Sequence, residues 1–189
     1  MNILIDYGYR EADMRAFPIE ELAEFALAAE ECPDNTEGSI SFVDNDEMAE
    51  LNEEYRGKVG PTDVLSFECD GLDDEEVFGD EGEAPIFTLG DVIIAPDVAE
   101  AQCASYGTTF EQEITLLLVH GLLHICGYDH IEDEDAAEMQ QRERDILGAW
   151  FAQRGAAQDI QDEPIAYVEL LAKRIAANSA MTPEQVEAL

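Results

Sequence analysis

The chain has 189 residues and carries 45 Asp and Glu against nine Lys and Arg, so its formal net charge is −36. Its length and its 46% apolar residues suffice for one core-forming domain with an appendage, which argues against wholesale disorder. Nine cations among so many anions cannot form the broad basic face of a typical nucleic-acid-binding protein. Any phosphate-bearing substrate must therefore be bound at one place on the surface, by a metal ion or a single well-placed arginine.

The first residues, MNILID, lack the basic segment and the cleavage site of a signal peptide, which predicts a cytoplasmic protein. The longest apolar run, residues 114–126, is shorter than the roughly 20 residues of a membrane span, and it contains histidine, so we expect a buried helix. The four cysteines are widely spaced without a CxxC pair, which predicts reduced, mostly buried thiols.

In the first half of the chain, aliphatic runs and helical spacing of apolar residues predict interleaved strands and helices. The expected elements are strands over residues 2–7, 38–44 and 63–67 and helices over residues 18–32 and 46–55. Residues 70–83 are dominated by Asp, Glu and Gly, which favours a solvated loop.

In the second half, the strongest strand signal covers residues 86–95, with a bulge or bend expected at Gly90. Pro96 is typical of the first turn of a helix, and Gly107 of its end. The next helix begins with a capping box at residues 109–112 and ends near Gly127 after about 17 residues. A further helix is expected over residues 132–147.

The composition changes after Gly155, where a polar linker over residues 158–163 precedes an expected amphipathic helix over 164–177 and a helix start at residue 182. We therefore divide the chain into a main domain, residues 1–152, and a partly helical C-terminal extension, residues 153–189. The element order has no steady βαβ repeat and no Gly-rich phosphate loop. It predicts an α+β fold with a small mixed β-sheet packed with helices.

All three histidines of the chain lie in one short window, HGLLHICGYDH. Positions i and i+4 of a helix share a face, so His120 and His124 can direct their imidazoles at one point. Gly127 can end the helix with a positive φ and turn His130 toward the same point. Three neutral imidazoles with an open fourth position are typical of catalytic zinc, so we predict one Zn²⁺ ion held by these three histidines.

The structural alternative makes His120 and His124 hydrogen-bonded core residues and His130 a loop residue. The clustering favours a metal, because burying two imidazoles in so apolar a helix is costly without a shared partner. The spacing HxxxHxxGxxH is that of metzincin proteases, whose motif HExxHxxGxxH carries a general-base Glu. Position 121 is Gly here, so a peptidase would need its base from elsewhere in the chain.

The window HGLLHICGYDH resembles the signature of the YbeY family of bacterial metal-dependent endoribonucleases, also called rRNA maturation factors. Upstream segments extend the resemblance: NEEYRGK at 52–58 leads into PTDVLSF at 61–67, and LGDVII follows at 89–94. The resemblance covers roughly residues 1–152. The acidic segment 70–83 and the chain after about Gly155 depart from the family pattern.

The resemblance implies an α+β fold, zinc held by His120, His124 and His130, and Arg56 as a catalytic residue in the cleft. It also implies cleavage of single-stranded RNA during maturation of the small-subunit (16S) rRNA 3′ end, with a part in ribosome quality control. The implied partners are single-stranded rRNA, the small ribosomal subunit, one of its proteins and an assembly GTPase, and no membrane is implied.

Phosphodiester cleavage requires stabilisation of charge on phosphate oxygens, which zinc and a bidentate Arg56 can supply. Without the resemblance, Arg56 would be interpreted as one side of a surface ion pair. Lys58 is a weaker candidate for contact with the RNA backbone. Asp63, Asp91 and Asp129 either orient a histidine or act as loop caps and solvated carboxylates.

Two other functions stay open on the residues alone. One is a metallohydrolase that acts on peptides, which the metzincin spacing favours. The other is a ribosome-assembly factor whose metal is structural. In that case removal of the metal lowers the melting temperature and abolishes binding to the ribosomal subunit, and the purified protein shows no metal-dependent cleavage of any substrate.

Overall fold

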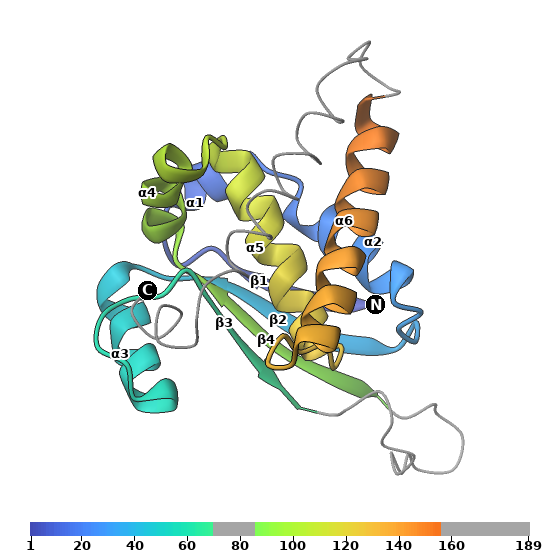
Figure 1. Cartoon of the computed structure of the whole chain (residues 1–189), viewed down its shortest axis with the longest axis horizontal. Coiled ribbons are helices and arrows are strands. Elements are labelled where there is room, and N and C mark those ends of the chain that lie inside the picture. The colour runs from blue at the N-terminus through green and yellow to red at the C-terminus, as the bar shows by residue number, and fades with distance from the viewer. Residues whose placement is uncertain (70–85, 156–189) are drawn as a thin grey trace.

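The computed structural model describes residues 1–69 and 86–155 of the chain (Figure 1). Strands and helices alternate irregularly along this part of the molecule. They are β1 (Asn2–Asp6), α1 (Glu11–Met14), α2 (Ile19–Ala29), β2 (Thr36–Phe42), α3 (Asn45–Arg56), β3 (Val64–Glu68), β4 (Phe87–Ile94), α4 (Pro96–Tyr106), α5 (Phe110–Ile125) and α6 (Asp133–Gly155).

The four strands form one mixed sheet in the order β1-β2-β4-β3. β1, β2 and β4 run parallel, and β3 pairs antiparallel with β4 at the edge. The register between β2 and β4 shifts next to Gly38, and Gly90 has φ 142°. A Cβ atom on Gly90 would lie 2.1 Å from the carbonyl oxygen of Phe67 on β3, so the bend predicted there needs glycine.

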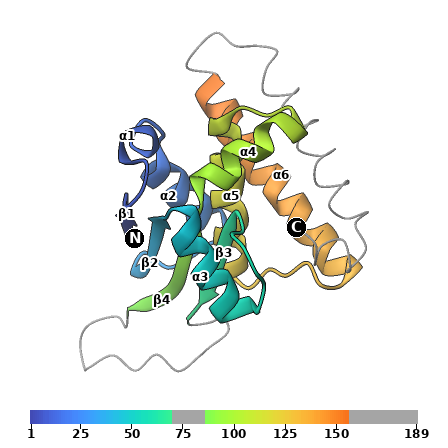
Figure 2. The same ribbon diagram turned by 90° about the vertical axis from the view of Figure 1, so that its left-hand side faces the viewer.

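The helices divide between the two faces of the sheet. α5 lies against β3 and β4, and α2, α4 and α6 surround it on that face (Figures 1 and 2). The hydroxyl of Ser66 on β3 donates to the carbonyl oxygen of Gly121 on α5 at 3.2 Å. Side chains alternate along a strand, so Leu65 points the other way, where it packs with Met48 of α3. The edge strand β3 therefore separates α5 from α3.

The main core lies on the α5 face of the sheet. α5 is apolar on nearly every side because it contacts the sheet below and other helices around it, and its residues Leu118 and Leu123 are almost completely buried. Aromatic side chains join the outer helices, as where the rings of Phe25 on α2 and Trp150 on α6 lie 5.5 Å apart. This packing holds α5, the helix that carries two of the histidines, rigidly between the sheet and α6.

The helix boundaries follow the capping signals in the sequence. Thr109 and Gln112 form the predicted capping box at the start of α5, and Gly107 ends α4 with φ 72°. Asp44 caps α3, because its carboxylate accepts from the backbone N–H groups of Asp46 and Glu47. The predicted α+β fold with a small mixed sheet is confirmed.

Several details differ from the sequence prediction. α2 ends at Ala29, three residues before the predicted end at residue 32. β2 begins and ends two residues earlier than expected, at Thr36 and Phe42. α1 was not predicted, because four residues are too short for a periodic pattern, although its Met14 is fully buried. α6 continues to Gly155, well past residue 147, because Trp150 packs against α2.

The predicted loop 70–83, linker 158–163, helix 164–177 and helix start at 182 lie outside the described residues. The division at residue 152 therefore stays a prediction. Across residues 1–69 and 86–155, every helix is too short or too polar to cross a membrane.

Candidate metal centre

The three histidines meet at the C-terminal end of α5. His120 and His124 project from consecutive turns of α5, and their Nε2 atoms lie 3.1 Å apart. His130 reaches the same point from the following turn, with ring centroids 5.6 Å from His120 and 4.9 Å from His124. One ring nitrogen from each histidine lies within 4.8 Å of the other two, so the cluster can hold a single metal ion.

Hydrogen bonds at the opposite ring nitrogens decide which way the lone pairs point. Nδ1 of His124 lies 3.0 Å from the carbonyl oxygen of Tyr128, which can only accept, so this Nδ1 carries the proton. Nδ1 of His120 lies 2.6 Å from a carboxylate oxygen of Glu143 and donates to it. Both neutral rings then turn an Nε2 lone pair toward the other at 3.1 Å, an arrangement that needs a shared proton or a cation. The donor set therefore fits a divalent metal.

Glu143, which the sequence analysis did not single out, lies on α6 with its side chain only 4% exposed. The hydrogen bond of its carboxylate is with Nδ1 of His120, in the carboxylate–histidine arrangement common in metal sites. A signal was present in the sequence, since Glu143 shares the core-facing stripe of α6 with Met139, Ile146 and Leu147. A charged residue at a core position needs a partner, and here the partner is a histidine of the cluster.

The turn that brings His130 back is built from local signals. Gly127 has φ 94°, as predicted, and lets the chain leave α5 sharply. Oδ1 of Asp129 accepts from the backbone N–H groups of His130 and Ile131, which locks the loop just after the turn. Asp129 thus orients His130 through its backbone rather than through its ring.

An ion pair behind the turn connects it to the rest of the fold. Glu30 at the end of α2 accepts from the guanidinium of Arg142 on α6 and from the hydroxyl of Tyr128. Burial and this hydrogen bond to a carboxylate raise the pKa of Tyr128 to about 12. Glu30 therefore holds in place the residue whose carbonyl orients His124.

The surroundings favour the neutral imidazoles of His124 and His130. Burial, reinforced by the nearby His120 and His130, lowers the pKa of His124 to about 4. Burial and the proximity of His120 also lower the pKa of His130. Neutral imidazole is the form that binds a metal, so these rings are ready to coordinate at neutral pH.

The lowered pKa predicts how the metal-free protein responds to acid. Above pH 6.5, His124 is neutral in both the folded and the unfolded chain. Between pH 6.5 and about 4, only the unfolded chain binds a proton there, so the free energy of unfolding falls by about 3 kcal/mol as the pH drops through this window. Urea titrations in chelator at several pH values measure the loss, and His124→Gln should lose distinctly less. Equal losses in the two proteins would contradict the prediction.

Gly121, the residue that departs from the protease motif, faces the sheet. A Cβ atom there would lie 2.6 Å from Cγ1 of Val92, 3.2 Å from Oγ of Ser66 and 3.3 Å from Cγ2 of Val64. A glutamate at this position could not reach the histidines without displacing β3 and β4. Position 121 therefore serves close packing and cannot supply a general base.

Gly121→Ala is expected to destabilise the protein by about 1–2 kcal/mol through this clash. A loss of stability would be informative, because alanine is intrinsically better than glycine in a helix by about 1 kcal/mol and would otherwise stabilise the protein. Val92→Ala removes the nearest methyl group, so the double variant should be more stable than the sum of the two single losses predicts. Urea denaturation measures all four proteins, and an unchanged or more stable Gly121→Ala would refute the clash.

In the part of the chain that the structure describes, the other site residues predicted from the sequence do not contact the histidine cluster. Asp63 is a cap, since it accepts from the backbone N–H of Val64 and from the amide of Gln102. Asp91 accepts from the hydroxyl of Ser39 on the face of the sheet opposite α5. Arg56 is the exposed last residue of α3, across the edge strand β3 from α5.

The cysteines are only partly as predicted. All four are free thiols, but only Cys32 and Cys126 are buried, while Cys103 is intermediate and Cys69 exposed. The Sγ atoms of Cys32 and Cys126 lie 3.9 Å apart. Cys126 is therefore part of the core beside the cluster.

The fold and the site together define an α+β protein whose histidine triad can hold a metal ion. The family described as Endoribonuclease YbeY matches residues 9–150. An Endoribonuclease YbeY of Bacillus cytotoxicus is 42% identical over 157 residues, covering 82% of this chain and all of the relative. One from Staphylococcus aureus is 43% identical over 137 residues, covering 72% and 87%. The chain belongs to the YbeY family.

The solved structures agree on the fold. A solution structure of a Thermotoga maritima protein superimposes with a TM-score of 0.52 at 24% identity, over 96% of this chain and 97% of the other. At this identity the likeness concerns the fold alone.

Proposed function

We propose that this chain is a metal-dependent endoribonuclease that uses one Zn²⁺ ion to cleave single-stranded RNA at the 3′ end of the small-subunit (16S) rRNA. The observation that carries the proposal is the convergence of His120, His124 and His130, with one ring nitrogen of each within 4.8 Å of the other two, in a member of a family of endoribonucleases. Membership supports RNA as the substrate class, and the donor set supports a borderline divalent metal such as zinc.

Each residue of the centre has a definite part in the proposal. His120, His124 and His130 would hold the ion and leave further coordination positions open. A bound divalent metal supplies Lewis acidity toward a phosphate oxygen and makes water more acidic. Glu143 and the carbonyl of Tyr128 keep the Nδ1 protons of His120 and His124 in place, so that both Nε2 atoms stay available.

Arg56 is proposed to contact the phosphate beside the cleaved bond. Four other arginines of the described chain pair with carboxylates, namely Arg10, Arg15, Arg142 and Arg154. Arg56 makes no ion pair within residues 1–69 and 86–155, and it ends the helix that flanks β3. An uncommitted guanidinium in so acidic a chain is available for bidentate binding of phosphate.

The proposal is tested by coupling metal content to cleavage. Purified protein is loaded with zinc and incubated with unstructured RNA and, separately, with a casein substrate, each with and without chelator. We expect cleavage of RNA alone, and its loss in chelator. Arg56→Ala should keep the metal and lower cleavage of RNA about tenfold or more, because a hydrogen bond to a charged group contributes about 1.5–3 kcal/mol.

Arg154→Ala serves as the matched control for Arg56→Ala, since it removes an exposed arginine at the C-terminal end of α6. It should change cleavage much less than Arg56→Ala. Cleavage of casein would favour a peptidase. If zinc-loaded protein cleaves neither substrate and chelator only lowers the melting temperature, the metal is structural and the endoribonuclease proposal fails.

The partners and the location follow the same proposal. With a net charge of −36, affinity for free RNA should be weak and should fall steeply with salt. We therefore propose that protein contacts on the small ribosomal subunit, including one of its proteins and an assembly GTPase, bring this enzyme to rRNA in the cytoplasm. Tight, salt-insensitive binding to naked RNA would contradict this.

A further inference from the structure

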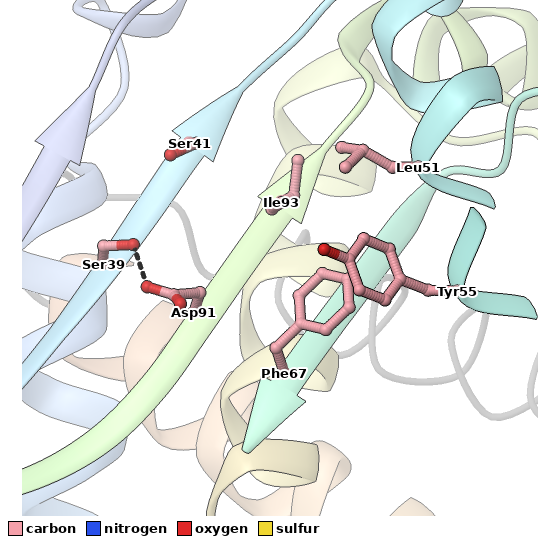
Figure 3. Close-up of a pocket in the computed structure, with 7 residues that line it drawn as sticks. All are labelled: Ser39, Ser41, Leu51, Tyr55, Phe67, Asp91 and Ile93. Atoms are coloured by element: carbon pink, nitrogen blue, oxygen red, sulfur yellow. Dashed lines mark hydrogen bonds between the residues drawn. The ribbon is translucent and has the colours of Figure 1, made fainter. Parts of the chain in front are cut away.

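A cavity of about 380 Å³ opens on the face of the sheet opposite the histidine cluster (Figure 3). It spans two neighbouring rows of strand residues. In the first row Ser39, Asp91 and Phe67 lie side by side across β2, β4 and β3, and in the second row Ser41 pairs with Ile93. The volume is within the range of small-molecule pockets, and the proposed cleavage site does not account for it.

One side of this cavity is polar. The hydroxyl of Ser39 donates to Oδ1 of Asp91, as the dashed line in Figure 3 shows, so the carboxylate is held with its other oxygen open to an incoming donor. The hydroxyl of Ser41 on the same strand makes no hydrogen bond within the described chain. This side therefore offers a strong acceptor, and beside it a group that can donate or accept.

The other side is aromatic. Tyr55 of α3 and Phe67 of β3 meet edge to face, with ring centroids 4.8 Å apart and an interplanar angle of 68°. Tyr55 is 59% exposed, so much of its ring is open to an incoming partner. Leu51 and Ile93 complete an apolar floor. A flat ring can stack here while its edge meets the polar side.

Charged residues of both signs adjoin Tyr55 in the chain, and the exposed Glu53 and Glu54 precede it. Tyr55 is followed by Arg56 and, two residues later, by Lys58, and neither cation makes an ion pair within residues 1–69 and 86–155. Unpaired cations next to an exposed aromatic ring are the combination that single-stranded nucleic acid requires, with phosphates on the cations and a base on the ring.

We propose that this cavity is a second RNA subsite, which stacks one unpaired nucleobase against Tyr55 and hydrogen-bonds the exocyclic amino group of that base to Asp91. The inference rests on the proposed function for its ligand class, since the strand bound here would be the RNA cut at the histidine cluster. Bases with an amino group donate to a carboxylate, whereas uracil presents a carbonyl oxygen in the same place.

The two sites are connected around the edge of the sheet. β3 is the edge strand, with α5 on one face and α3 on the other. An RNA strand that passes around β3 leaves its scissile phosphate on the histidine side and an unpaired base on the Tyr55 side. Such a route favours single-stranded RNA, because a duplex would first have to unpair and unstack a base to place it in the cavity.

The test is equilibrium binding in chelator, so that cleavage does not enter the measurement. Fluorescence anisotropy at low ionic strength compares oligo(rC) with oligo(rU), two pyrimidines of the same size that differ in the amino and carbonyl groups. We expect the wild type to bind oligo(rC) about fivefold more tightly, as one added hydrogen bond implies. Asp91→Leu should bring this ratio close to one.

Tyr55→Ala should weaken binding of oligo(rC) about tenfold, since stacking of one base contributes about 1–3 kcal/mol. Tyr55→Phe keeps the ring and should stay within about twofold of the wild type. Leu4→Ala is the matched control, because Leu4 is 70% exposed on the same sheet face and lies outside the cavity. It should bind as the wild type does. Circular dichroism and urea titration verify that each variant is folded.

The outcomes separate the two proposals. If Tyr55→Ala binds oligo(rC) as tightly as the wild type, the subsite is refuted, even when zinc-loaded protein cleaves RNA. If binding depends on Tyr55 and Asp91 but no RNA is cut, the subsite stands and the endoribonuclease proposal falls. A wild type that binds oligo(rU) at least as tightly as oligo(rC) overturns the role of Asp91 and with it the base preference.

Discussion

His124→Ala is expected to abolish stoichiometric zinc binding and to lower cleavage of RNA at least about a thousandfold. His124 is the central ligand of the cluster, with Nε2 3.1 Å from that of His120 and its ring 4.9 Å from His130. Two imidazoles alone bind zinc far more weakly than three, and loss of the metal removes several kcal/mol of charge stabilisation at the phosphate. Metal analysis and cleavage assays on the same preparation measure both effects.

Controls keep this prediction from depending on unfolding. Removing the half-buried imidazole of His124 leaves space beside α5, so His124→Asn, whose side chain is smaller than histidine but still polar, provides a second variant. Glu111→Ala changes an exposed residue of the same helix and should keep both metal and activity. A folded His124→Ala that retains one zinc per chain and cuts RNA at the wild-type rate would show that the cluster is not the metal centre.

The histidine triad was predictable because all its determinants are local. The i, i+4 spacing on an apolar helix and the glycine turn place His120, His124 and His130 within eleven residues of chain, and no long-range pairing is needed to bring them together. The boundaries of α4 and α5 were predictable for the same reason, since Gly107 and the capping box of Thr109 act on their own backbone. Helix caps, glycine turns and side chains that share a helix face can therefore be predicted from the sequence.

Residues that act across the fold were not predictable in this way. Glu143 meets His120 only because α6 packs against α5, a contact that no spacing rule gives. In the sequence, Asp63 and Asp91 were equally plausible partners of a histidine. In the structure Asp63 caps the backbone N–H of Val64, and the alternation of side chains along β4 places Asp91 on the face opposite α5, where it binds Ser39. The reason for Gly121 likewise needed the sheet, because only β3 and β4 exclude a side chain there.

The negative net charge of the chain does not mean that every cation is paired with a carboxylate. The first turn of α6 exposes Asp133, Glu134 and Asp135 to water, where they repel anions from that part of the surface. Arg56 and Lys58 are left without carboxylate partners in the described chain. An acidic protein that leaves cations uncommitted at one place directs RNA to that place instead of binding it over the whole surface.

Glu143→Ala is expected to weaken zinc binding about 10- to 100-fold, although Glu143 does not itself belong to the triad. Its carboxylate accepts from Nδ1 of His120 at 2.6 Å and is almost completely buried. Without it, the buried Nδ1–H loses its acceptor, and the ring is free to rotate or to change tautomer, which removes the lone pair from the cluster. Competition with a chromophoric chelator measures the affinity.

Glu143→Gln separates orientation from charge. The amide oxygen can still accept from Nδ1 of His120, so affinity should fall less than in Glu143→Ala, and cleavage at saturating zinc should return close to the wild-type rate. Glu138→Ala, an exposed carboxylate on the same helix, controls for the loss of one negative charge. If Glu143→Ala binds zinc as tightly as the wild type, His120 does not depend on α6 for its orientation. If all three variants weaken binding equally, long-range charge and not the hydrogen bond to His120 sets the affinity.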